Sequence, residues 1–222
     1  DWHGGKAGRQ ACALDSRQWN FSSDADRGDT QLRVFARRGL QGTDRIRAVG
    51  DLGAATATTV IDAAGRYVTA GFIDVHSHAG PGLATPGLRE GRPVLAQGIT
   101  TVLVNPDGGG PVDLVAQRAA YEKGGIGLNV GLMVPHGSVR AAVLGMTDRD
   151  PSPAEQAQMN ALVRDGMRAG AFGLSSGLYY APGSYSKTAE VIAMAKEVAP
   201  FRGSYSSHIR DEADYGVGVV AA

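Results

Sequence analysis

The feature that most constrains the fold is a regular alternation of short apolar, β-rich runs with longer segments that carry helix signals. Intervals of this kind are typical of βα units, and consecutive βα units form a parallel sheet with right-handed crossovers. The 32 glycines are spread along the chain and suit the tight junctions between strand, loop and helix. The predicted strands are Gly71–Val75, Thr100–Val104, Asn129–Val134, Ala171–Ser175 and Gly203–Ser207. The sequence therefore predicts an α/β fold over most of its length.

The segments between these runs contain physical start and stop signals for helices. Ser152 precedes Pro153 and Glu155, which is a capping box with proline at the first helical position, and Gly170 is placed to end that helix. Its apolar face is expected to consist of Met159, Leu162, Val163 and Met167. The other predicted helices are Asp113–Lys123, Thr188–Val198 and, interrupted by Gly91 and Pro93, the weaker Thr85–Gln97.

Charge and cysteine content exclude several classes of protein. The 22 basic and 22 acidic side chains balance, which argues against a nucleic-acid binder and gives no support for an anionic membrane as partner. A single cysteine, Cys12, excludes an intrachain disulfide framework and a multi-cysteine zinc site. The chain has no apolar run of about 18 residues and no secretion signal at its start. The cytoplasm is the default location, but a removed signal would leave the periplasm or secretion open.

Histidines stand where predicted strands end. The segment GFIDVHSH runs an apolar strand into His76 and His78, whose side chains point to one face because the strand period is two. Two imidazoles on a rigid strand end form a clip for a divalent metal. His208 ends a later run and can join them, because the carboxyl ends of parallel barrel strands converge. The alternatives are two surface histidines at the start of a loop and, for His208, a lone hydrogen-bonded side chain.

The loop after the second strand offers an oxygen ligand at the same edge. It reads Asn105-Pro106-Asp107-Gly108-Gly109-Gly110, and its glycines allow backbone to approach a ligand closely. Asp107 either binds or bridges a metal or only caps the turn. The loop lacks the lysine and the spacing of a phosphate-binding loop.

Four segments together resemble the N-acyl-D-amino-acid deacylases (D-aminoacylases) of the amidohydrolase superfamily: GFIDVHSH, GITTVLVNPDGGG, GAFGLSSGLYYAPGSYS and SSHIRDE. The resemblance covers about Asp44–Ala222. It implies a (β/α)₈ TIM-type barrel beside a small β-sandwich, holding one or two zinc ions. The implied activity is hydrolysis of the amide bond of a small N-acyl-D-amino acid by a metal-activated water.

The resemblance also implies roles for particular residues. His76, His78 and His208 match metal ligands, and Asp107 stands where many members carry a zinc-binding cysteine.

Tyr179 and Tyr180 match a loop near the substrate side chain, with ordinary loop packing as the alternative. His136 lies in a segment similar to the family's GHG loop and is interpreted as a residue that either supports the metal ligands from behind or lines the site, not as a ligand. Arg210 pairs either with the substrate carboxylate or with Asp211.

Five strands form only part of a barrel, since eight strands need about 250 residues. The resemblance calls for one more histidine ligand and a catalytic aspartate, which we expect beyond the end of the chain, so no catalytic residue is assigned. We expect an irregular segment at 1–45, a β-sandwich remnant at 46–69 and the N-terminal part of the barrel at 70–222. Within the first segment only Gln31–Arg37 alternates like a strand. An unclosed sheet edge predicts poor solubility or pairing with a second chain.

Two other functions remain open at this point. One is an amidohydrolase of the dihydroorotase or hydantoinase type, which usually has a carboxylatable lysine on the fourth strand; Ala171–Ser175 contains none. The other is a non-catalytic fragment of the same fold.

Overall fold

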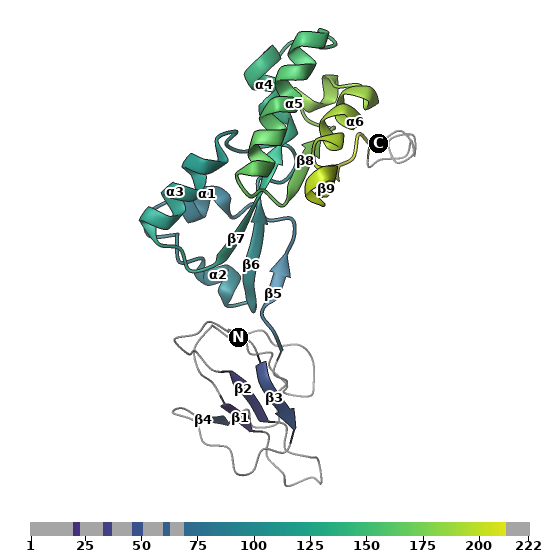
Figure 1. Cartoon of the computed structure of the whole chain (residues 1–222). Helices are drawn as coiled ribbons and strands as arrows, with labels where there is room; N and C mark the ends of the chain where they lie inside the picture. The colour runs from purple at the N-terminus through teal and green to yellow at the C-terminus, as the bar shows by residue number, and fades with distance from the viewer. Residues whose placement is uncertain (1–19, 23–32, 37–45, 51–59, 63–68, 212–222) are drawn as a thin grey trace. The chain divides into compact units, whose positions relative to one another are not determined.

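The computed structural model describes residues 20–22, 33–36, 46–50, 60–62 and 69–211 (Figure 1). The chain divides into two compact units, one of residues 1–73 with 92–100 and one of residues 74–91 with 101–222. Each unit is described by itself. Among the described residues, no helix combines the length and the apolar character needed to cross a membrane.

The first unit contains a four-stranded sheet with the order β3-β2-β1-β4. Its strands are β1 (Asn20–Ser22), β2 (Arg33–Ala36), β3 (Ile46–Gly50) and β4 (Val60–Asp62). β1 and β3 pair with β2 in antiparallel fashion, and β4 pairs with β1 in parallel. β2 lies within the predicted strand Gln31–Arg37, whereas β1 occupies a stretch for which irregular structure was expected. Strands from both sides of residue 45 thus share one sheet, and the proposed domain boundary there stays a prediction.

The second sheet has five strands in sequence order, β5-β6-β7-β8-β9, and it curls as part of a barrel (Figure 1). β7 pairs in parallel with β6 and with β8, and β8 pairs in parallel with β9. Its strands are β5 (Phe72–Asp74), β6 (Ile99–Val104), β7 (Asn129–Pro135), β8 (Gly173–Gly177) and β9 (Ser204–His208). The predicted α/β fold with a partial TIM-type barrel is confirmed.

Helices connect these strands. They are α1 (Gly80–Ala84), α2 (Arg92–Leu95), α3 (Leu114–Gly124), α4 (His136–Leu144), α5 (Pro153–Arg168) and α6 (Thr188–Lys196), with short 3₁₀ turns η1 (Gly183–Tyr185) and η2 (Ala199–Phe201). α3, α5 and α6 lie where the sequence predicted helices. The weak candidate Thr85–Gln97 contains only the four residues of α2, and neither α1 nor α4 was predicted.

The best-defined helix, α5, forms because its ends are satisfied locally. The Ser152 side chain accepts a hydrogen bond from the Glu155 backbone at 3.3 Å, and the Glu155 carboxylate accepts one from the Ser152 backbone at 2.8 Å. Gly170 adopts the left-handed φ of +96° that ends the helix. Of the predicted apolar face, Met159, Val163 and Met167 are buried, and Leu162 is half-buried. This face packs against α4, α6 and β7.

Candidate metal centre

His76 and His78 lie just beyond the end of β5, and the backbone fixes both. The Asp74 carboxylate accepts a hydrogen bond from the His76 backbone at 3.1 Å. Between the two histidines, buried Ser77 donates its backbone N–H to the Leu103 carbonyl of β6 at 2.9 Å. The imidazole rings lie 5.6 Å apart, with an angle of 65° between their planes. The alternation of side-chain direction thus continues beyond the end of β5, so that the His76 and His78 rings lie on the same side.

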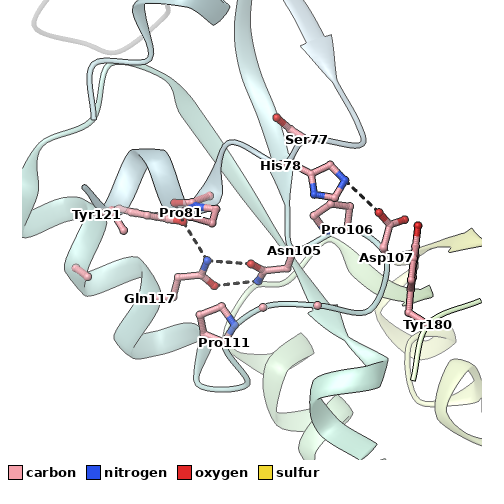
Figure 2. A pocket seen from close by; sticks show the side chains of 15 residues that line it. Ser77, His78, Pro81, Asn105, Pro106, Asp107, Pro111, Gln117, Tyr121 and Tyr180 are labelled. Atoms are coloured by element: carbon pink, nitrogen blue, oxygen red, sulfur yellow. Dashed lines mark hydrogen bonds and ion pairs between the residues drawn. The ribbon is translucent and has the colours of Figure 1, made fainter. Parts of the chain in front are cut away.

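Asp107 reaches this pair from the loop after β6. Its Oδ1 lies 3.2 Å from Nε2 of His76, and its Oδ2 lies 3.1 Å from Nε2 of His78 (Figure 2 shows the second contact). The residue has a left-handed φ of +54°, as does Asn105 with +64°. Such values are uncommon outside glycine, although aspartate and asparagine tolerate them best. The loop thus adopts strained backbone and places a carboxylate between two imidazoles.

Three segments meet tightly at the residue that follows Asp107. A Cβ on Gly108 would lie 2.9 Å from the Gly177 nitrogen and 3.0 Å from the Gly137 nitrogen, so only glycine fits. The Gly108 carbonyl accepts a hydrogen bond from the Ser138 backbone at 3.0 Å, and its N–H donates to Ser175 Oγ at 3.2 Å. Hydrogen bonds and close packing therefore hold the Asp107 loop against the start of α4 and against β8.

The three side chains suit a divalent cation. Among the described residues, they form the group of histidine, cysteine and acidic side chains whose ligand atoms lie within 4.8 Å of one another. Two donors on one tetrahedral zinc ion stand about 3.3 Å apart, close to the nitrogen–oxygen distances found here. Asp107 Oδ1 is buried and has no hydrogen-bond partner, because its contact with His76 has a short distance but not hydrogen-bond geometry. No hydrogen bond uses the lone pairs of that oxygen, so they are available to a metal cation.

His208 ends β9, as predicted, but it is not part of this group. The ring of Tyr180 stacks on its imidazole with centroids 4.8 Å apart, and the Tyr179 ring meets it edge-on at 5.6 Å. Its role as a further metal ligand stays a prediction.

Tyr180 also lines a pocket together with His78 and Asp107. Tyr179 is 60% exposed. Arg210 is half-buried two residues beyond β9, and its pairing with a substrate carboxylate also stays a prediction.

Comparison with known proteins decides the family. The model of the amidohydrolase family matches residues 59–221, which is most of the chain. The chain belongs to the amidohydrolase family. Among curated relatives of this amidohydrolase, D-aminoacylase of Alcaligenes xylosoxydans xylosoxydans is 32% identical over 207 residues, covering 83% of the chain and 42% of the relative. N-acyl-D-aspartate deacylase of the same organism is 36% identical over 197 residues, covering 77% and 39%.

Solved structures agree with the sequence relatives. A crystal structure of D-aminoacylase superposes with a TM-score of 0.77 at 28% identity, covering 91% of this amidohydrolase and 47% of that protein. N-acyl-D-glutamate deacylase from Bordetella bronchiseptica, complexed with zinc and a phosphonate inhibitor, gives 0.75 at 31% identity, covering 90% and 46%. The chain thus spans less than half the length of the relatives that it matches.

His136 lies elsewhere than expected. It is the first residue of α4 rather than part of a loop, and its side chain is fully buried. Its Nε2 lies 3.2 Å from Oε1 of Glu190, whose Oε2 accepts a hydrogen bond from Arg140 at 2.7 Å. Burial leaves His136 no surface to offer a ligand, and its predicted role, either behind the metal ligands or lining the site, stays a prediction. The amidohydrolase uses it in a buried ionic network that joins α4 to α6.

A pocket of about 610 Å³ opens beside the metal centre of the amidohydrolase (Figure 2). Its floor is a chain of hydrogen bonds that the sequence analysis missed, formed by Asn105, Gln117 and Tyr121. Burial raises the pKa of the Tyr121 hydroxyl, and the hydrogen bond from Gln117 offsets part of that rise. The available signal was the spacing of Gln117 and Tyr121, which puts two polar side chains on one face of α3.

Proposed function

We propose that this chain serves the zinc-dependent hydrolysis of N-acyl-D-amino acids, which yields a D-amino acid and a carboxylate. The observation that carries the proposal is the contact of His76 and His78 with Asp107 at the carboxyl ends of β5 and β6. The names of the relatives support the substrate class, and the zinc in the N-acyl-D-glutamate deacylase structure supports the metal.

The donor set fits zinc better than a hard cation. Two imidazoles with one carboxylate suit zinc and neighbouring transition metals, whereas magnesium and calcium prefer oxygen alone. When bound, zinc polarises a carbonyl and makes water a nucleophile at neutral pH. The side chains are open to a ligand, since those of His76 and His78 are 43% and 72% exposed.

The remaining roles belong to residues around the centre. His208 supplies a further ligand, the rings of Tyr179 and Tyr180 contact the substrate, and Arg210 binds its carboxylate. In support, both tyrosine rings pack on His208, and Tyr180 shares a pocket with Asp107. We assign proton transfer to no described residue.

The metal centre is tested by the zinc content of the purified full chain. Asp107→Asn keeps the size of the side chain but removes its charge, so we expect bound zinc to fall at least tenfold by elemental analysis after dialysis. His76→Ala should have the same effect. The control is Asp165→Asn, because this carboxylate on α5 is 67% exposed and forms a surface ion pair with Arg168. Equal zinc in all four proteins would remove the centre.

The reaction is tested separately with N-acetyl-D-amino acids and their L-isomers, by measuring the released amine. We expect zinc-dependent release from the D-isomers. Bound zinc without release would leave the chain a metal-binding scaffold and would contradict its catalytic role.

A further inference from the structure

We propose that the pocket beside His78 and Asp107 binds the acyl chain of the substrate and that it is large enough to accept chains longer than acetyl. This inference rests on the proposed function and adds the part of the substrate that the pocket accepts. It concerns the space between α1, α3 and the loop 105–111, which Gln117 and Tyr121 line together with His78 and Asp107 (Figure 2).

The polar atoms on the floor of the pocket already have partners. The amides of Asn105 and Gln117 exchange two hydrogen bonds, at 2.9 and 3.0 Å, and Asn105 also donates to the Met133 carbonyl at 3.1 Å. Gln117 donates to the Tyr121 hydroxyl at 3.0 Å, and that hydroxyl donates to the Gly80 carbonyl at 3.0 Å. All four amide hydrogens and the hydroxyl hydrogen are used, so this floor has no donor left for a ligand.

Most of the walls are apolar, and the hydroxyl-bearing side chains outside the floor are those of Ser77 and Tyr180, which lie next to the metal centre. The apolar walls are formed by the side chains of Pro81, Ala84, Pro106, Pro111 and Ala120. Among the described residues that line the pocket, none is a lysine or an arginine. The polar groups that face it from the metal centre are His78 and Asp107, at one end (Figure 2). A ligand that matches this distribution has a polar group at the centre and an apolar, uncharged tail.

The chemistry of an N-acyl amino acid decides which half of the substrate is that tail. The scissile amide separates an acyl half, which carries no charge, from an amino-acid half, which carries a carboxylate. A carboxylate placed among the apolar walls would lose water and meet neither a lysine nor an arginine, which is costly. The acyl half meets no such penalty. At about 610 Å³ the pocket lies within the range that accommodates drug-sized ligands, so an acetyl group leaves much of it unfilled.

The test uses N-alkylsulfonyl-D-alanines, whose sulfonyl group replaces the scissile carbonyl and resists hydrolysis. Dissociation constants of the zinc-loaded full chain are measured by calorimetry for the methyl, propyl and pentyl compounds. Burial of one methylene contributes about a fourfold gain in affinity, so we expect the pentyl compound to bind at least tenfold more tightly than the methyl compound. A second series keeps the methylsulfonyl group and replaces D-alanine by D-norleucine.

The variant Ala120→Leu narrows the pocket, and Ala119→Leu is its matched control. Both alanines are exposed positions of α3, but only Ala120 lines the pocket. We expect Ala120→Leu to abolish the advantage of the pentyl compound over the methyl compound. Ala119→Leu should behave like the wild type.

Two results would overturn the inference. One is equal affinity for all three sulfonyl chains in the wild type. The other is a D-norleucine preference that Ala120→Leu removes, because the pocket would then hold the amino-acid side chain. In either case, zinc-dependent hydrolysis of N-acetyl-D-alanine would persist. Loss of that hydrolysis together with loss of all binding would instead refute the proposed function itself.

Discussion

At the scale of single residues, Gly108 is the position on which the Asp107 carboxylate depends. Its φ is +68°, and a Cβ at this position would lie 2.9 Å from the Gly177 nitrogen and 3.0 Å from the Gly137 nitrogen. In Gly108→Ala, the new methyl group must push the loop away from Gly177 and Gly137. We expect bound zinc, measured by elemental analysis, to fall at least tenfold, with a loss of about 1 kcal/mol of unfolding free energy from the strained backbone.

Gly87→Ala separates the two effects. Gly87 has a φ of +88°, but a Cβ there meets nothing within 4 Å. It should lose similar stability in urea unfolding and keep its zinc. If both variants lost zinc equally, the steric explanation for Gly108 would be wrong.

The buried network of Glu190 with Arg140 and His136 gives a second prediction. Glu190→Gln removes the negative partner of a guanidinium that is fully buried. Breaking one side of a buried ion pair costs about 3 kcal/mol or more, because the remaining charge stays desolvated. Urea unfolding should show this loss. Glu197→Gln, just after α6, removes the partner of Arg164, whose side chain is 40% exposed, and should cost less than about 1 kcal/mol.

The grouping of single residues was predictable from the sequence only where it depended on local signals. His76, His78 and Asp107 lie shortly after the ends of neighbouring strands, so strand period and strand order predicted that they would meet. His136 also follows a strand, yet its partner Glu190 lies 54 residues away on α6. Nothing in the local sequence showed that this histidine and this carboxylate would be buried together, so the contact between them was not predicted.

At the scale of elements, the start of α5 gives a prediction about pH. Hydrogen bonds from Arg149, and then those from Ser152, hold the pKa of the Glu155 carboxyl far below its usual 4.5. A carboxyl whose pKa is lower in the folded state contributes stability above its unfolded pKa and loses it as pH falls toward the folded value. The unfolding free energy of the wild type should therefore exceed that of Glu155→Gln at pH 7. The difference should shrink progressively below about pH 4.5.

Chemical denaturation at pH 7, 5, 4 and 3 measures this difference. Because the pair is on the surface, added salt should also reduce it. A difference that stays constant down to pH 3 would show that the folded and unfolded carboxyl titrate alike.

Elements with strong local signals were predicted, and those without them were missed. Caps and apolar spacing located α3, α5 and α6. α4 begins at His136, immediately after the last residue of β7, and its N-cap, Pro135, provides no side-chain hydrogen bond. β8 lies two residues later than predicted, since its sequence GLSSG has small side chains and no β-branched residue to mark it. Its burial comes from neighbouring strands instead.

At the scale of the whole molecule, β5 and β9 are the two edges of the five-stranded sheet. Apolar side chains lie exposed at both: Val75, just after β5, is 64% exposed, and Tyr205 of β9 is 45% exposed. Open edges with apolar neighbours favour pairing with another chain. We expect the isolated chain to self-associate, with a mass by light scattering that rises with concentration.

Val75→Lys should shift this equilibrium toward the monomer, because a charge at an edge opposes pairing. Val115→Lys is the control, since Val115 is 56% exposed on α3, away from the edges. A concentration-independent monomer that melts cooperatively would contradict the expectation.

The fastening of the Asp107 loop has a kinetic consequence. The Ser138 backbone of α4 and the Ser175 hydroxyl of β8 hold the loop through contacts that involve no metal, so capture of an ion needs no folding of the loop and little loss of chain entropy. The rate of ion uptake is then governed by how fast the cation sheds its hydration shell, and metals with labile water should enter soonest.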